Sequence, residues 1–191
     1  MVAAKKPATY EDLLAVPDHL VAEIVNGELV VSPRPAYRHA RVSTRLGGAL
    51  DAFDRDGAEG GGPGGWIILF EPELHLGSRC GQVVIPDLAG WRRERMPEVP
   101  DVPWGELAPD WVCEVASPST GRHDRIVKSA IYLDAGVPWL WLVTAETMTI
   151  EVLEARDGRW TLVTSAVGPE PRRLAPFEAL DLDVGRLLAM R

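Results

Sequence analysis

The stretch "DWVCEVASPSTGRHDRIVKSAIYLDAGVPWLWLVT", residues 110–144, contains two short apolar runs separated by an amphipathic segment. The runs at 110–117 and 137–144 have the length and composition of buried strands. Residues 117–136 have the spacing of a helix, which Gly136 is expected to end. A strand, a helix and a strand in this order require a crossover connection, so the two strands are expected to be parallel neighbours in one sheet.

Further elements are predicted on both sides of this unit. The sequence predicts helices at 9–17, 35–55 and 184–190, strands at 66–76 and 81–91, and hairpins at 19–33 and 147–164, with turns at Asn26-Gly27 and Asp157-Gly158. A proline-rich loop at 92–109 is of the kind that often lies over a functional site. No repeat or change of composition marks a boundary, so residues 1–191 are interpreted as one α/β domain with a mixed, curved β-sheet flanked by helices.

The overall composition restricts the class of protein. The chain has 20 basic and 28 acidic side chains and a net charge of −8. This balance argues against non-specific coating of DNA, because neutralising phosphates needs lysine and arginine, although it leaves room for a local basic groove. No apolar run reaches the roughly 18 residues of a membrane span, and the N-terminal residues lack the apolar core of a signal peptide. We therefore expect a cytoplasmic protein that does not contact membranes.

Two acids interrupt runs that otherwise have the composition of core. Asp87 follows Pro86 in "VVIPDLAGW", and Glu114 lies inside "WVCEV". Buried carboxylates are costly unless they are paired, hydrogen-bonded or bound to a metal, and two on adjacent strands would repel. A shared divalent cation is the simplest way to keep both ionised. The alternative is that Asp87 opens a turn and Glu114 lies on a solvated strand face, although the strand period places Glu114 beside small apolar residues.

Two further residues are candidates for the same site. Lys128 lies on one helical face with Asp124 and Tyr132, so it could lean back over the end of the Glu114 strand and stabilise charge on a phosphate. The alternative is an exposed Asp124–Lys128 pair. Glu23 is the one polar residue in the apolar run of the first hairpin and would help to bind an ion, although a solvent-facing strand position is equally open.

Basic residues are concentrated in three stretches. These stretches contain Arg34, Arg38, Arg41 and Arg45, then Arg92, Arg93 and Arg95, then Arg122, Arg125 and Lys128. Because two of them adjoin Asp87 and Glu114, a phosphate-bearing substrate would meet positive charge there. The predicted substrate contacts are Arg92, Arg93, Arg122, Arg125 and Ser117. Ordinary solvated helix faces are the alternative, and His39 is interpreted as a surface helix residue.

The linked motifs resemble a known family. "AEIVNGELVVSP" (22–33), "IPDLAGW" (85–91), "WVCEVASPST" (111–120) and "DRIVKSAIYLDAGVPWLWLV" (124–143) occur in the order seen in the Uma family of restriction-endonuclease-like proteins. That family is a bacterial branch of the PD-(D/E)xK nuclease superfamily. The resemblance covers nearly the whole chain and implies a restriction-endonuclease-like fold.

The resemblance also implies roles for particular residues. Pro86-Asp87 resembles the superfamily's "PD", and Glu114-Val115-Ala116 resembles its third motif, with Ala116 where the signature lysine would be. Members with the same departure take the lysine from the following helix, which points to Lys128. Glu23 resembles the glutamate that the superfamily carries in its first helix or strand region. By resemblance, Mg²⁺ or Mn²⁺ would be held by Asp87, Glu114 and the Val115 carbonyl, with help from Glu23, and the protein would form a homodimer.

Two hypotheses for function remain open on the sequence. The first is a magnesium-dependent endodeoxyribonuclease in which Asp87, Glu114 and Lys128 are catalytic. The second is a catalytically inactive module on a nuclease-like fold that binds nucleic acid or protein. The retained acids and Lys128 favour the first, whereas Ala116 and the net charge of −8 favour the second. Sequence preference, DNA against RNA, and biological role cannot be read from the residues.

Overall fold

A computed structural model describes residues 6–55, 62–77, 81–116 and 121–189, except for the side chains of 121–125. The helices are α1 (Tyr10–Leu14), α2 (Tyr37–Asp54), α3 (Gly121–Asp134) and α4 (Val184–Leu188). The strands are β1 (Leu20–Val25), β2 (Glu28–Pro33), β3 (Trp66–Phe70), β4 (Glu73–Leu76), β5 (Gln82–Val84), β6 (Leu88–Arg92), β7 (Trp104–Gly105), β8 (Trp111–Val115), β9 (Trp139–Thr144), β10 (Thr149–Arg156), β11 (Arg159–Val167), β12 (Pro171–Arg173) and β13 (Asp181–Asp183).

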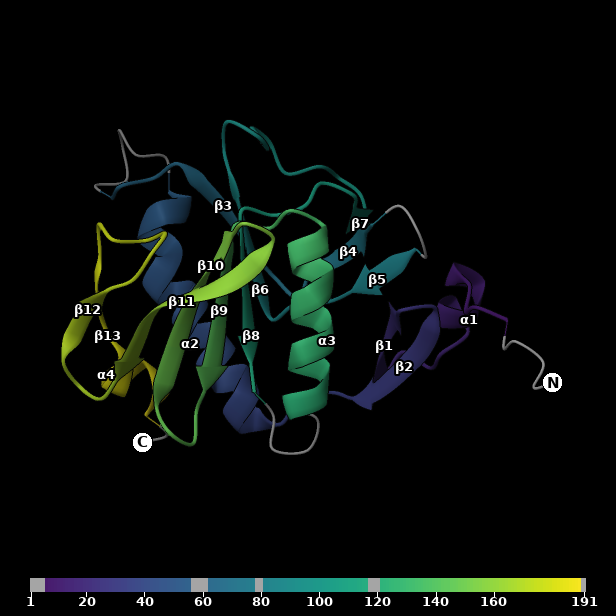
Figure 1. Cartoon of the computed structure of the whole chain (residues 1–191), viewed down its shortest axis with the longest axis horizontal. Helices are drawn as coiled ribbons and strands as arrows, with labels where there is room; N and C mark the ends of the chain where they lie inside the picture. Colours follow the sequence, from purple (N-terminus) through teal and green to yellow (C-terminus); the bar gives the residue numbers. More distant parts are fainter. Residues whose placement is uncertain (1–5, 56–61, 78–80, 117–120, 190–191) are drawn as a thin grey trace.

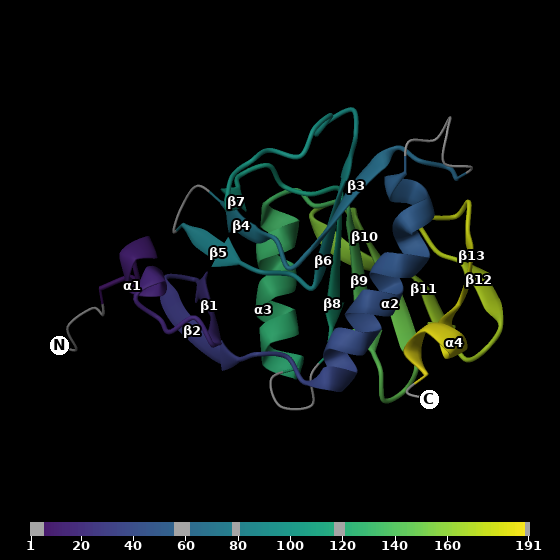
Figure 2. The same ribbon diagram turned by 180° about the vertical axis from the view of Figure 1, so that it is seen from behind.

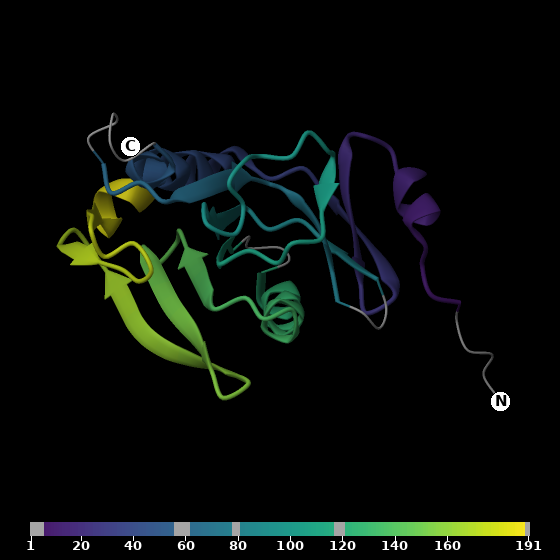
Figure 3. The same ribbon diagram turned by 90° about the horizontal axis from the view of Figure 1, so that it is seen from above.

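A six-stranded mixed sheet lies between two helices. Its strand order is β11-β10-β9-β8-β6-β3, and α2 and α3 lie on opposite sides of it (Figures 1 and 3). The neighbours β8 and β9 are parallel, as the strand–helix–strand stretch at 110–144 predicts, and β6 pairs antiparallel with β8. The predicted class, a mixed α/β fold with helices on the sheet, is therefore confirmed.

The central strand β8 shows how the sequence divides the core into two layers. Trp111, Cys113 and Val115 pack into the cluster on the α2 side. Val112 packs with residues of α3 in the other cluster. Because side chains alternate across a strand, Glu114 also faces α3. An apolar run buried on both faces therefore places one carboxylate under the α3 helix.

The predicted single sheet is wrong in one respect, because the strands expected at 66–76 and 81–91 are each broken in two. In the six-stranded sheet β3 pairs with β6, whereas β4 and β5 pair in a second, five-stranded sheet of order β2-β1-β5-β4-β7. The two breaks lie side by side, because the register runs from Phe70↔Leu88 to Leu74↔Val84. Prolines at both breaks, Pro72 and Pro86, cannot donate ladder hydrogen bonds.

The second sheet carries the N-terminal part of the chain away from the first sheet (Figure 2). Its hairpin β1–β2 turns at Asn26 and Gly27, whose φ angles of 52° and 78° fit the predicted type I′ turn. The second predicted hairpin, β10–β11, turns in the same way at Asp157 and Gly158. The short pair β12–β13 is a feature that the sequence did not predict. In the described ranges, no helix is both long and apolar enough to cross a membrane.

We expect Gly90→Ala to destabilise the protein. A Cβ on Gly90 would lie 3.2 Å from ring carbons of both Trp111 and Trp66. Such overpacking of a core typically costs about 1–3 kcal/mol. The measurement is urea unfolding followed by tryptophan fluorescence. The control is Gly48→Ala at an exposed position of α2, where an added Cβ meets nothing within 4 Å. This change should stabilise the protein by roughly 0.5–1 kcal/mol. Equal free energies of unfolding for the two variants would contradict this account of the core.

Candidate active site

Asp87 lies at the break between β5 and β6. The pairing of Leu88 with Cys113 places Asp87 beside the C-terminal end of β8. Its side chain is buried, and its Oδ2 accepts a hydrogen bond of 2.7 Å from the Val115 backbone N–H. The strand break is therefore what turns this carboxylate toward the backbone of the Glu114–Val115 segment.

His39, near the N-terminus of α2, contacts the same two residues. Its Nε2 is 3.1 Å from Asp87 Oδ1 and 3.1 Å from the Val115 carbonyl oxygen. Because both partners accept hydrogen bonds and donate none, Nε2 must carry the proton and donate to them. The interpretation of His39 as a surface residue is wrong: one turn later, Val42 lies on the buried face of α2, and the His39 side chain is 13% exposed.

The electrostatic environment of His39 favours its protonated form. Burial by itself would lower the pKa of His39, but the hydrogen bond and charge of Asp87 outweigh that effect. The Val115 carbonyl and the Glu114 carboxylate act in the same direction, so the pKa is raised. The imidazole thus occupies the space between Asp87 and Val115 as a hydrogen-bond donor.

Lys128 brings together three segments that are far apart in the sequence. Its Nζ lies 2.9 Å from Glu114 Oε1 and 2.9 Å from Glu23 Oε1, and it donates a 2.9 Å hydrogen bond to the Ile85 carbonyl. Its side chain is only 8% exposed. The alternative of an exposed Lys128 paired with Asp124 is therefore wrong for Lys128, and the Asp124 side chain lies outside the described residues.

Glu23 faces the interior of the site and not solvent. Its Oε1 accepts a 2.7 Å hydrogen bond from the Ile85 N–H in addition to its contact with Lys128. Two donors on one oxygen hold the carboxylate between β1 and the residues that follow β5. The contacts found for Glu23 position Lys128. Because Glu114 Oε1 lies equally close to the same ammonium, Glu23 lies near one predicted metal ligand, and its own metal role stays a prediction.

Tyr132 completes the surroundings of Glu114. It lies one helical turn after Lys128 on α3, is fully buried, and donates a 2.6 Å hydrogen bond from its hydroxyl to Glu114 Oε1. Burial raises the pKa of Glu114 to about 7; the Lys128 charge opposes this shift, whereas Asp87 and Glu23 add to it. For Lys128, burial would lower the pKa, but the Glu114 and Glu23 carboxylates raise it above its ordinary value. The lysine is therefore a permanent cation.

The site contains more acidic than basic groups. Glu114 and Glu23 contact the Lys128 ammonium, and Asp87 contacts the His39 imidazole. Burial is the main cause of the raised pKa of Glu114, and the charges of Asp87 and Glu23 add to it. Carboxylate oxygens and backbone carbonyls are the donors that suit Mg²⁺ and Mn²⁺. The oxygen donors at the site are of that kind, but among the described residues no three His, Cys, Asp or Glu side chains are grouped as metal ligands.

One acid of the site was missed in the sequence. Glu71 lies at the other strand break, and its N–H donates a 3.1 Å hydrogen bond to the Asp87 carbonyl. Its φ of 44° is a left-handed conformation that non-glycine residues adopt at a cost of about 1–3 kcal/mol, mostly at functional sites. Burial and the Asp87 charge raise the pKa of Glu71. The signal was available, because "FEP" places an acid beside a proline in an apolar run, as "IPD" does.

Arg92 and Arg93, predicted to bind substrate, do not lie at this site. They follow Asp87 by five and six residues, so Arg92 lies roughly 16 Å along β6 at the usual strand rise. The Arg92 guanidinium lies 4.2 Å from the centre of the Trp66 ring, and Arg93 donates a 2.6 Å hydrogen bond to the Asp54 carbonyl. Both arginines therefore stabilise the opposite end of the sheet.

The other predicted substrate contacts cannot be placed. Ser117 lies outside the described residues, as do the side chains of Arg122 and Arg125. Arg45, from the first basic stretch, donates a 2.9 Å hydrogen bond to the Arg186 carbonyl, so it caps the end of α4. The basic stretch on α2 is thus partly structural.

Comparison with known proteins places the chain in a fold and a family. The chain shares its fold with a crystal structure titled as a putative nuclease belonging to DUF820 from Anabaena variabilis ATCC 29413: the TM-score is 0.71 at 19% identity, covering 96% of this chain and 100% of that one. The profile of the Uma2 family, described as "Putative restriction endonuclease", matches residues 7–185. The chain belongs to the Uma2 family. No curated protein matches it significantly.

We expect Glu23→Gln and Lys128→Met to be strongly coupled in stability. Each change removes one partner of a buried ion pair, and leaving a buried charge without its partner is destabilising by several kcal/mol. The double variant should therefore lose about 1–3 kcal/mol less than the sum of the single variants. Urea unfolding of the four proteins gives the coupling free energy.

The matched control is the exposed pair of Glu170 and Arg172, whose side chains are 73% and 51% exposed. A cycle of Glu170→Gln and Arg172→Met should give a coupling below about 1 kcal/mol, as surface pairs do. A buried cycle with a coupling as small as the surface one would show that Lys128 does not depend on Glu23.

Proposed function

We propose that this protein is a metal-dependent DNA endonuclease that hydrolyses phosphodiester bonds. One observation carries the proposal: Lys128 contacts the buried Glu114 carboxylate, and the buried Asp87 carboxylate accepts a hydrogen bond from the next residue of the same strand, Val115. A purely structural ion pair would need one acid for the one lysine. The additional acids can be balanced by protonation or by a cation, and a bound divalent ion would keep Asp87 and Glu114 both ionised.

Asp87, Glu114 and the Val115 carbonyl are the groups that would hold the metal, Mg²⁺ or Mn²⁺. In the described part of the chain, no three His, Cys, Asp or Glu side chains form a ready metal-binding group, so water would fill the remaining positions, as magnesium tolerates. Lys128 and Tyr132 both contact Glu114 Oε1, which leaves Oε2 as the oxygen for an ion. A divalent cation bound there would polarise the phosphate and lower the pKa of a bound water.

Lys128 would act by its fixed positive charge. Three acceptors around its ammonium, on Glu23, Glu114 and Ile85, hold it in one position before any substrate arrives. A preorganised charge in a water-poor site stabilises the additional negative charge on a phosphate in the transition state. The lysine thus replaces the one missing at Ala116, from the next helix and not from the same strand.

Asp87 is positioned by the residues around it. The Val115 N–H fixes its Oδ2, and the His39 imidazole fixes its Oδ1. Because the His39 N–H lies between two proposed metal ligands, the ring would have to lose that proton and bind the ion, or turn aside. Glu71, next to the Asp87 backbone, adds negative charge at the same place.

We propose DNA as the substrate because the family description names a restriction endonuclease. With a net charge of −8, the protein would depend on a few local phosphate contacts, so its affinity would fall less steeply with salt than that of a basic nuclease. A homodimer would present two such sites, one for each strand of a duplex.

The second candidate is a binding module that has lost catalysis. Lys128 favours it, because the ammonium is neutralised by two carboxylates and is 8% exposed. If no metal ion binds Glu114, a lysine with those contacts would only stabilise the fold. The two candidates differ in whether a metal binds and whether plasmid DNA is nicked.

We expect Asp87→Asn and Glu114→Gln each to abolish nicking of supercoiled plasmid in Mg²⁺ or Mn²⁺. Each change removes one negative ligand from a site with few protein ligands, so metal affinity measured by calorimetry should fall as well. The control is Asp110→Asn, since Asp110 pairs with Arg95 away from the site. Wild-type nicking by either site variant would refute the assignment.

We expect Lys128→Met to lower turnover by roughly ten- to a thousandfold, as the loss of one preorganised stabilising group does. Metal binding should persist or tighten, because a cation that repels the ion is gone. Lys128→Arg should rescue little, since a planar guanidinium cannot replace a compact ammonium between two acids.

Unfolding of Lys128→Met with and without metal distinguishes a catalytic role of Lys128 from a structural one. Lys128→Met leaves Glu23 and Glu114 without their cation, so Mg²⁺ or Mn²⁺ should raise its unfolding midpoint more than that of the wild type. Normal turnover in the folded variant would show that Lys128 is not catalytic and that its role is structural.

A further inference from the structure

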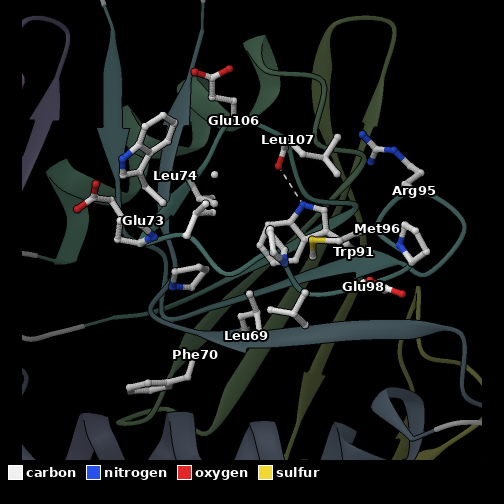
Figure 4. Close-up of a pocket in the computed structure, with 18 residues that line it drawn as sticks. Leu69, Phe70, Glu73, Leu74, Trp91, Arg95, Met96, Glu98, Glu106 and Leu107 are labelled. Atoms are coloured by element: carbon white, nitrogen blue, oxygen red, sulfur yellow. Dashed lines mark hydrogen bonds between the residues drawn. The ribbon is translucent and has the colours of Figure 1, made fainter.

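A cleft separate from the acidic cluster lies beneath the proline-rich loop at 92–109. It has a volume of about 740 Å³ and is lined by the end of β3, the start of β4 and the loop (Figure 4). Asp87, Glu114 and Lys128 do not line it. The loop was expected to cover the functional site, but it borders this neighbouring cleft.

The loop is held in place by side-chain contacts on the walls of the cleft. Trp91 Nε1 donates a 2.9 Å hydrogen bond to the Leu107 carbonyl, which Figure 4 shows as a dashed line between two lining residues. At the other wall, Trp104 stacks on His75 with ring centres 4.3 Å apart and planes inclined by 12°. Because both walls are fixed, the cleft exists before any occupant binds.

Apolar side chains are concentrated at this cleft. Five of the fourteen exposed large apolar side chains in the described chain line it, namely Phe70, Val99, Val102, Trp104 and Leu107. Their exposed fractions range from 37% for Trp104 to 58% for Val102. Apolar surface gathered in a concave site on a soluble domain marks a place where another molecule binds.

The charged groups around the cleft are acidic. Glu73, Glu98 and Glu106 line it and lie on different sides of it in Figure 4. The one basic lining residue, Arg95, is paired with Asp110 at 2.7 Å. Phosphates would be repelled here, so nucleic acid is not the occupant. A second copy of this chain, with its net charge of −8, is disfavoured for the same reason.

A sheet edge borders the cleft. The short strand β7 is the last strand of the five-stranded sheet in the described chain and pairs with β4 alone, through Glu73↔Trp104 and Leu74↔Gly105. A Cβ on Gly105 would meet no atom within 4 Å, so the face of the strand at this residue is open. An extended peptide can use such an edge for main-chain hydrogen bonds while neighbouring pockets take its side chains.

We propose that this cleft binds an extended segment of a partner protein that carries apolar side chains interspersed with lysine or arginine. The apolar side chains would contact Val102, Trp104 and Leu107, and the basic ones would lie against Glu98 and Glu106. The cleft adjoins the acidic cluster, because Phe70 and Pro72 line it on either side of Glu71. The peptide proposal does not depend on the proposed DNA cleavage, and peptide binding can be measured in the absence of DNA.

The test is selection of random dodecapeptides from a phage library on the wild-type protein, with Val102→Lys as the counter-selection. Val102→Lys removes an exposed apolar contact and adds a positive charge to the rim. We expect enriched peptides with net positive charge and alternating apolar residues. Synthesised with a fluorescent label, they should bind Val102→Lys about tenfold more weakly than wild type in fluorescence anisotropy.

The matched control is Val167→Lys on β11, because Val167 is 55% exposed and this variant has the same change in net charge. It should bind the selected peptides as the wild type does. Blocking alternate peptide amides by N-methylation should weaken binding by about tenfold if main-chain pairing contributes.

Four outcomes of the peptide experiments would overturn the proposal. They are no enrichment over the counter-selection, enrichment of acidic or uncharged peptides, equal binding to the two valine variants, and binding that is indifferent to N-methylation, as a small apolar ligand site would give. Sedimentation of the wild type beside Val102→Lys completes the test. A dimer lost only in that variant would assign the face to a second copy of the chain and would also overturn the proposal.

Discussion

The Lys128 ammonium is the interaction on which the arrangement of this molecule depends. It joins Glu23 of the five-stranded sheet to Glu114 of the six-stranded sheet. It also donates a hydrogen bond to the Ile85 carbonyl at the strand break. Buried charges are tolerated only when their partners are close and correctly placed. The relative position of the two sheets, the strand break and helix α3 is therefore fixed by one side chain that would be unstable in any other arrangement.

The strand breaks supply the second constraint. Two antiparallel strands that would otherwise continue through both sheets are interrupted side by side, and Glu71 and Asp87 lie at the interruptions. The prolines prevent the ladder from closing, so backbone groups near them need other partners. Glu23 takes the Ile85 N–H, and Lys128 takes the Ile85 carbonyl. The irregular backbone and the acidic cluster are thus one feature: the side chains of the site satisfy the backbone that the breaks leave unpaired.

The site and the apolar cleft lie on either side of this break and differ in chemical character. The cluster around Asp87 combines acids with a fixed cation, and we propose it as the place for a metal and a phosphate. The cleft under the proline-rich loop combines apolar side chains with an acidic rim and fits a basic peptide. Because Phe70 and Pro72 belong to the cleft and Glu71 between them contacts Asp87, the two surfaces share a short stretch of backbone. An acidic protein can in this way separate a phosphate site from a protein-binding site.

The sequence by itself determined the elements and the chemistry of the main residues. Apolar periodicity, the Asn26-Gly27 and Asp157-Gly158 turns and the strand–helix–strand stretch predicted most of the helices and strands, because these signals are local. The acids at Asp87 and Glu114 stood out because carboxylates are rare in apolar runs. Only the tertiary structure decided that one expected sheet is two, that His39 is buried against Asp87, that Glu23 holds Lys128, and that Arg92 lies at the far end of β6. Each of these depends on contacts between residues distant in sequence, and local patterns of polarity carry no information about which distant partner a side chain meets.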